Sequence, residues 1–203
     1  MEHPQVSDAA QDLVKKALAV KEGPLYVAAI GAITNVASAI LMEPKIIEKI
    51  VVVWLGGNAL HWPDTKEFNL KQDMAASRLI LDCGVPLVQI PVMGVTSHLH
   101  TTLSEIDTYV KGQGAIGDYL AKIYQGFFKD HFGRSKVIWD IAAIAYLINP
   151  EWLPSKLVPS PILTDELTWG FNDSRHQVRY AWHVSRDPVF SDLFAKLEKH
   201  MEK

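Results

Sequence analysis

The sequence predicts an α/β fold with a mostly parallel sheet and helices on both faces. Short apolar runs bounded by glycine or proline occur at residues 25–30, 50–55 and 87–90, as expected for strands that are buried on both sides. Amphipathic segments lie between these runs, and strands that alternate with helices indicate parallel pairing. With 203 residues, 48% of them hydrophobic, we expect one domain, residues 1–203, with a sizeable core.

The first half of the chain is the more regular. Ser7 is a predicted N-cap for a helix that Gly23-Pro24 ends. Thr34-Asn35 opens a second helix that runs through residue 41, and Asp73 caps a third that runs through residue 81. The polar loop 58–72 is long for a compact domain, and we therefore expect it to be functional.

The second half has fewer periodic segments. The prolines between residues 150 and 161 predict an irregular, turn-rich stretch. The alternation from residue 177 to 183 predicts a strand. The helices expected here cover residues 116–128, 141–148 and 187–199.

Charge and composition exclude several classes of protein. The formal net charge is −3 and the basic residues are scattered, so we expect no nucleic-acid partner. Apolar runs fall short of the ~20 residues of a membrane span, so we expect no membrane partner. The first 22 residues carry too many charges for a signal peptide. The single cysteine, Cys83, excludes an internal disulfide and fits a reducing compartment. These features predict a cytoplasmic protein.

The loop 58–72 carries a group of polar side chains. Asn58, Glu67 and Asn69 together offer two carboxamides and a carboxylate, which suit the hydroxyl groups of a sugar such as ribose. Taken singly, asparagines are common in loops for reasons of turn geometry. Phe68 could pack against the sugar or simply anchor the loop.

Asp140 directly precedes the apolar helix 141–148. It can serve as an N-cap, a role that aspartate fills well, or as a ligand of a hard cation. Calcium takes six to eight oxygen ligands, so one carboxylate is insufficient. The backbone carbonyl of Thr34 is a second candidate ligand, although Thr34-Asn35 alone reads as a strand-to-helix turn.

Trp139 is either an ordinary core tryptophan or a surface on which a purine stacks. Stacking on an aromatic side chain contributes roughly 1–3 kcal/mol per base. Trp169, Tyr180 and Trp182 are possible second walls of such a base site.

Four segments stand in a fixed order: Gly31-Ala32-Ile33-Thr34-Asn35-Val36-Ala37, Val53-Trp54-Leu55-Gly56-Gly57-Asn58, Glu67-Phe68-Asn69-Leu70-Lys71-Gln72-Asp73-Met74-Ala75-Ala76 and Trp139-Asp140. They resemble the G-P-[LI]-T-N-[VIL]-A segment, the strand ending in M-G-G, the E-[FW]-N-x-x-x-D-P-x-A-A segment and the late Trp-Asp motif of the inosine-uridine preferring nucleoside hydrolase family. Ala32 and Met74 each replace a proline. The Trp-Asp form resembles the purine-preferring branch.

This resemblance implies calcium-dependent hydrolysis of the N-glycosidic bond of purine ribonucleosides. By resemblance, Asp140 and the carbonyl of Thr34 bind calcium, and Trp139 stacks on the leaving base. The same resemblance assigns the ribose to Asn58, Glu67 and Asn69, with Phe68 beside it.

The family's opening cluster, D-x-D-x-x-x-D-D, has no counterpart in this sequence. That cluster supplies the general base and most calcium carboxylates, so we expect an N-terminally incomplete member with weak calcium binding. The resulting open sheet edge predicts a homo-oligomer. Two alternatives keep the same scaffold: a non-catalytic protein that binds a nucleoside or ribose, and a structural subunit that another chain completes.

Overall fold

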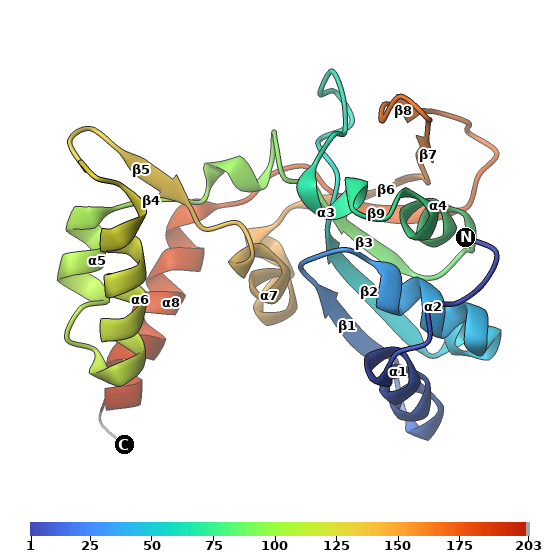
Figure 1. Ribbon diagram of the computed structural model, residues 1–203, viewed down its shortest axis with the longest axis horizontal. Coiled ribbons are helices and arrows are strands. Elements are labelled where there is room, and N and C mark those ends of the chain that lie inside the picture. The colour runs from blue at the N-terminus through green and yellow to red at the C-terminus, as the bar shows by residue number, and fades with distance from the viewer. Residues whose placement is uncertain (202–203) are drawn as a thin grey trace.

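The computed structural model describes the backbone of residues 1–201 and the side chains of residues 1–199. Figure 1 shows an arch: a sheet with its helices forms one end, a group of helices forms the other, and α7 (Ile141–Ile148) lies between them. None of the described helices is long and apolar enough to cross a bilayer.

The main sheet has the strand order β1-β2-β3-β9-β6. Its strands are β1 (Leu25–Ala29), β2 (Ile50–Leu55), β3 (Leu87–Ile90), β9 (Gln177–Ala181) and β6 (Ser155–Pro159). The first four are parallel, and only β6, at one edge, is antiparallel to its neighbour. The predicted fold class is therefore confirmed.

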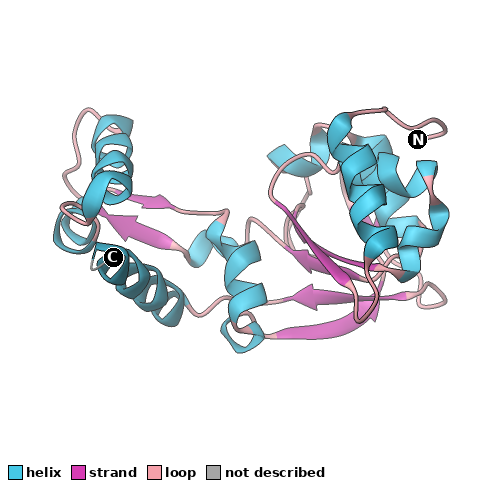
Figure 2. Cartoon of the chain, turned by 90° about the horizontal axis from the view of Figure 1, so that it is seen from below, coloured by secondary structure: helices cyan, strands magenta, loops and turns pink. Residues whose placement is uncertain are grey.

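Helices cover both faces of this sheet (Figure 2). On β2, Val52 and Trp54 face one core, whereas Val53 and Leu55 face the other, as the alternation of side chains along a strand requires. The first core is closed by α1 (Asp8–Ala19), α2 (Thr34–Met42) and α4 (Met74–Asp82). The second is closed by α7 and the beginning of α8 (Arg186–Met201).

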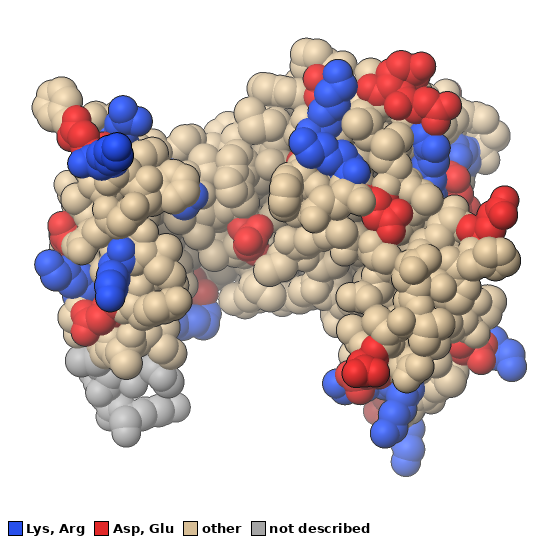
Figure 3. Space-filling model, viewed as in Figure 1, with Lys and Arg blue, Asp and Glu red and all other residues tan. Residues whose placement is uncertain are grey.

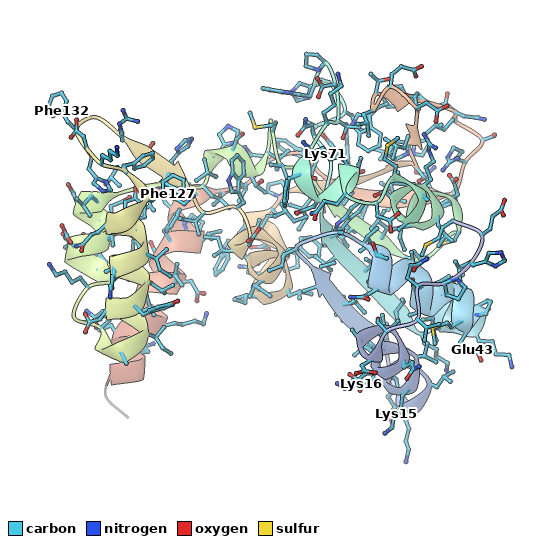
Figure 4. The ribbon with its side chains drawn as sticks, viewed as in Figure 1. Lys15, Lys16, Glu43, Lys71, Phe127 and Phe132 are labelled. Carbon is cyan, nitrogen blue, oxygen red and sulfur yellow. The ribbon has the colours of Figure 1, made fainter. Side chains whose placement is uncertain are left out.

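The other end of the arch is a smaller layer of helices. Here α5 (Leu103–Tyr109), α6 (Gly114–Phe127) and α8 enclose a cluster around Ile106, Ala121 and Tyr124. An antiparallel pair, β4 (His100–Thr102) and β5 (Ser135–Val137), joins this layer to the sheet. The loop between α6 and β5 projects outward, and Phe132 stands at its tip (Figure 4).

Several local predictions were wrong. The stretch 150–161, expected to be irregular, contains the 3₁₀ turn η3 (Pro150–Trp152) and strand β6. Proline is compatible with β6 because an edge strand needs hydrogen bonds on one side only. The expected loop 58–72 ends in a short helix, α3 (Phe68–Lys71), and β9 ends at Ala181 rather than at residue 183. The sequence reasoning also missed α5, β4, β5 and the small ribbon β7 (Ile162–Leu163) with β8 (Trp169–Gly170).

Candidate functional site

A pocket of about 510 Å³ lies at the carboxyl end of β1 and β2. In open parallel sheets this end is where ligands bind. Six of the seven predicted site residues line the pocket: Asn58, Glu67, Phe68, Asn69, Trp139 and Asp140. Residues from three separate segments of the chain therefore meet at one place, and the seventh, Thr34, is not part of the lining.

The turn after β2 depends on two glycines. Gly57 has a φ of +77°, which favours glycine, and a Cβ at this position would lie 2.7 Å from the ring of Trp169. A Cβ at Gly56 would lie 2.3 Å from the ring of Trp54. The chain can therefore turn closely beneath the pocket only because both positions lack a side chain.

Glu67 holds the floor of the pocket together. One carboxylate oxygen accepts a hydrogen bond from the N–H of Asn69 (2.8 Å), and the other accepts from Gly57 and Leu70 (both 3.0 Å). Glu67 is thus the N-cap of α3, and it also binds this helix to the turn after β2. The oxygen that accepts from Asn69 alone keeps one acceptor site for a ligand.

Both asparagines make internal hydrogen bonds. The Nδ2 of Asn58 donates to the carbonyl of Asp64 (3.0 Å), and its Oδ1 accepts from the N–H of Met93 (3.3 Å). The Nδ2 of Asn69 donates to the carbonyl of Leu55 (2.9 Å). These bonds orient the carboxamides, and each leaves part of the amide's hydrogen-bonding capacity for a ligand.

Two of the proposed second walls instead support the loop. The indole Nε1 of Trp169 donates to the carbonyl of Asn58 (3.0 Å), and the hydroxyl of Tyr180 accepts from the N–H of Leu60 (3.1 Å). Burial raises the pKa of Tyr180, against the opposing effect of the hydrogen bond from Leu60. Neither these two residues nor Trp182 lines the pocket.

Asp140 occupies the N-cap position of α7 but does not act as a cap. Its side chain accepts no hydrogen bond from the first turn of that helix. Partial burial raises the pKa of Asp140, and the charge of Lys136 opposes this rise. The N-cap alternative is therefore not supported, and the carboxylate is available to a ligand in the pocket.

Trp139 lies partly in the core and partly in the pocket lining. It is half-buried, with one part packed against the core that α7 closes and another part lining the pocket. Anchorage of one part of an indole in the core keeps the exposed part in a fixed orientation.

Thr34 has a different environment. Its hydroxyl donates to the carboxylate of Asp73 at 2.6 Å, and the same carboxylate caps α4 by accepting from Ala76 (2.9 Å). The Thr34 side chain therefore links α2 to α4.

Sequence reasoning did not single out Lys66, Ile30 and Met93, which also line the pocket. Lys66 directly precedes Glu67 in the predicted functional loop, and this position could have indicated that Lys66 lies in the pocket. Ile30 follows β1 and Met93 follows β3, so their position at the carboxyl edge of the sheet could also have been predicted from the sequence. They add a cation and two apolar contacts to the site.

The residues present do not make up a calcium shell. Among the described residues, no three His, Cys, Asp or Glu side chains are close enough together to hold a metal ion. Of the two carboxylates in the pocket lining, that of Glu67 already accepts three backbone hydrogen bonds. Calcium takes six to eight oxygens, so this part of the chain supplies only a minority of them.

The parallel sheet, its covering helices and the pocket at the strand ends define an α/β domain of the kind that binds a small molecule at the carboxyl ends of its strands. The sequence profile of the inosine-uridine preferring nucleoside hydrolases matches residues 2–191. The chain belongs to this family.

Curated relatives are distant and longer. Over 146 residues, 68% of this chain, it is 27% identical to the pyrimidine-specific ribonucleoside hydrolase RihB of Escherichia coli O1:K1 and covers 46% of that protein. The chain is 28% identical to a protein from Shigella boydii serotype 4, named as a putative pyrimidine-specific ribonucleoside hydrolase RihB, and covers 60% of it. The chain thus spans about half the length of these relatives.

Solved structures share the fold. An inosine-uridine preferring nucleoside hydrolase from Bacillus anthracis superposes with a TM-score of 0.76 at 20% identity, covering 96% of this chain and 66% of that one. A purine-preferring ribonucleoside hydrolase from Gardnerella vaginalis gives a TM-score of 0.76 at 21% identity, covering 98% and 67%. At these identities the likeness concerns the fold alone.

Proposed function

We propose that residues 1–203 form one nucleoside hydrolase-like domain whose pocket binds a purine ribonucleoside and supports hydrolysis of its N-glycosidic bond. The observation that carries this proposal is the meeting of an indole, two oriented carboxamides and two carboxylates in one pocket. Its volume, about 510 Å³, suits a small molecule.

In this proposal the sugar lies against the floor. The hydroxyl groups of the ribose bind Asn58, Glu67 and Asn69, with Phe68 at the rim beside them. Because the floor residues are fixed by hydrogen bonds to the backbone, they need little ordering when the sugar binds, which favours affinity.

The base stacks on Trp139 in this proposal. An anchored indole is a large, rigid surface, and stacking stabilises a bound base by roughly 1–3 kcal/mol. The Trp-Asp pair supports a purine preference. The relatives described as pyrimidine-specific make uridine the necessary comparison.

Cleavage of the bond requires a water molecule and a group that takes its proton. Family membership implies calcium as the metal that would bind the sugar diol, with Asp140 and the Thr34 carbonyl as ligands. The described residues do not complete the shell of this ion. The contribution proposed for this chain is binding, orientation of the sugar and stacking of the base.

A second candidate function is nucleoside binding without hydrolysis. The incomplete metal shell favours this function. The same incomplete shell would be found in a structural subunit that another chain completes.

The proposal is tested by incubating the protein with inosine or uridine, in the presence of calcium or of a chelator, and measuring the released base by chromatography. We expect inosine to bind more tightly than uridine, and any release of hypoxanthine to be faster than that of uracil and to be lost in Asp140→Asn. Binding of inosine without release would favour the second function, and neither binding nor release would contradict both.

A further inference from the structure

A short ribbon from the last third of the chain holds the loop that follows β2. Strands β7 and β8 pair antiparallel, and Figure 1 shows this ribbon beside the segment between β2 and α3. The indole Nε1 of Trp169 donates to the carbonyl of Asn58 (3.0 Å), and the carbonyl of Leu167 accepts from the N–H of Thr65 (2.7 Å). The ribbon therefore binds both ends of the segment 58–65.

The backbone of Asn58 is held on both sides. Its carbonyl accepts from Trp169, and its N–H donates to the Oγ1 of Thr65 (2.9 Å). Since Thr65 is itself bound by Leu167, the ribbon fixes Asn58 both directly and through this neighbour. A fixed backbone sets the direction in which the carboxamide of Asn58 enters the pocket.

The turn of the ribbon has a strained backbone. Leu167 has a φ of +59°, and no other non-glycine residue in the described part of the chain has a positive φ. Such a conformation is uncommon for a residue with a side chain. The N–H of Thr164 donates to the carbonyl of Thr168 (3.1 Å), and the N–H of Thr168 donates to the Oγ1 of Thr164 (3.0 Å). Backbone strain that the surroundings impose concentrates at functional sites, which draws attention to the contact of Leu167 with the loop.

The ribbon is attached to the core and to α4. Leu163 is buried, and its carbonyl accepts from the Nε of Arg78 on α4 (3.0 Å). The same guanidinium forms an ion pair with Asp165 (2.6 Å). Asp165 and Glu166 are exposed, and Figure 3 shows acidic side chains gathered at the corner of the molecule where the ribbon lies. The tip of the ribbon thus lies in solvent, whereas its base is fixed to the domain.

The ring of Trp169 also supports the turn after β2. A Cβ added at Gly57 would lie 2.7 Å from this ring, so the indole lies directly against the backbone of Gly57. The N–H of Gly57 in turn donates to Glu67 in the floor of the pocket. Trp169 therefore supports the floor although it does not line the pocket.

We propose that Trp169 is a positioning residue for the sugar, because it holds the carboxamide of Asn58 in the direction that the ribose requires. This inference rests on the proposed function and adds to it a residue outside the pocket that governs the affinity for the sugar. Thr65, bound by the strained Leu167, acts in the same way on the N–H of Asn58. Trp169 itself touches neither the sugar nor the base.

Isothermal titration with inosine measures the effect on affinity. Trp169→Phe keeps an aromatic ring and removes the N–H, and we expect about tenfold weaker binding than for the parent chain. Thr65→Val removes the other bond to the backbone of Asn58 and should weaken binding to a similar extent, so that the test does not depend on the folding of one variant. Trp182→Phe, a matched change at an exposed position, should bind as the parent does.

The side-chain amide signals in a nitrogen–proton NMR spectrum distinguish positioning from a general loss of structure. Asn58→Ala and Asn69→Ala identify the two signals. In the absence of ligand, Trp169→Phe should shift the signal of Asn58. It should leave that of Asn69 in place, because this carboxamide binds the carbonyl of Leu55 and not the ribbon.

Parent-like affinity of both Trp169→Phe and Thr65→Val would overturn the inference and leave the proposed function standing. An equal loss of affinity in Trp182→Phe, an unchanged signal of Asn58, or equal shifts of both amide signals would also overturn it. If the parent chain binds no inosine, the proposed function fails, and the spectra alone decide whether Trp169 orients Asn58.

Discussion

The carboxylate of Glu67 accepts a hydrogen bond of 3.0 Å from the backbone N–H of Gly57, ten residues earlier in the chain. This bond fixes α3 to the turn after β2, and the floor of the pocket is built from these two segments. The role of Glu67 in folding can therefore be measured separately from any role in binding.

Replacement of Glu67 by alanine should destabilise the protein by about 3 kcal/mol. The substitution leaves three N–H groups without their acceptor in a buried region, and each unsatisfied group costs roughly 1–3 kcal/mol. Urea unfolding measures the loss. Glu166→Ala, at an exposed position, is the control and should stay within about 0.5 kcal/mol. Equal stability of the two variants would show that Glu67 does not hold the floor.

Replacement of Gly57 by alanine should lower stability by roughly 2 kcal/mol or more, since it combines a strained φ with a contact of 2.7 Å to Trp169. Gly23→Ala separates the two effects. Gly23 has a similar φ of +66° but no atom within 4 Å of the added Cβ. The melting temperature of Gly57→Ala should therefore be well below that of Gly23→Ala. The reverse order would show that the contact between the added Cβ and Trp169 does not destabilise the fold.

The ion pair of Glu105 with Arg186 (2.5 Å) predicts a dependence of stability on pH. Burial raises the pKa of Glu105, but hydrogen bonds from Arg186, Thr101 and Thr102 together bring this pKa below its ordinary value of 4.5. Since the pKa is lower in the folded state, the ionised carboxylate stabilises the fold above about pH 4.5, and this contribution is lost as the pH falls through the folded-state pKa.

Glu105→Gln should therefore reduce the free energy of unfolding at pH 7 by about 1 kcal/mol. The difference from the parent protein should shrink as the pH is lowered below 4.5. Asp12→Asn, in an exposed pair with Lys16, is the control and should change little at either pH. A difference that stays constant with pH would contradict this assignment.

Calcium should bind this chain weakly, with a dissociation constant well above the micromolar range. Among the described residues no three metal-ligating side chains converge, and calcium takes six to eight oxygens. Isothermal titration of the metal alone measures the affinity, and Asp140→Asn should weaken it further. Micromolar affinity would contradict this prediction, because it would require further oxygen ligands to complete the shell.

The three parallel strands of the first half could be predicted because glycine or proline bounds each apolar run. β4 and β5 could not, because three residues such as His100–Thr102 are too few to show a period. The start of α5 could have been predicted, because Thr102 and Glu105 have the spacing of a capping box, and both of its reciprocal hydrogen bonds are present. β6 was hidden by Pro154 directly before it and Pro159 at its end, which an edge strand tolerates.

The pocket lining was predictable in part for a topological reason. Asn58 and Asp140 are far apart in sequence, but Asn58 follows a parallel strand and Asp140 begins a helix that packs against the same sheet. The internal hydrogen bonds of Asn58 and Asn69 were not predictable, because their backbone partners at Leu55, Asp64 and Met93 belong to three different segments whose packing the local sequence does not specify. Likewise, nothing local to Thr34 indicated that its hydroxyl binds Asp73.

The proposed function requires a nucleoside pocket with Trp139 as one wall, and inosine binding to Trp139→Leu tests this most directly. Leucine keeps an apolar side chain at the core but removes the surface for stacking. Isothermal titration should give about tenfold weaker binding than for the parent chain, while Trp182→Leu, outside the pocket, should bind as the parent does. Equal affinity of all three proteins for inosine, or no binding by any of them, would contradict the account.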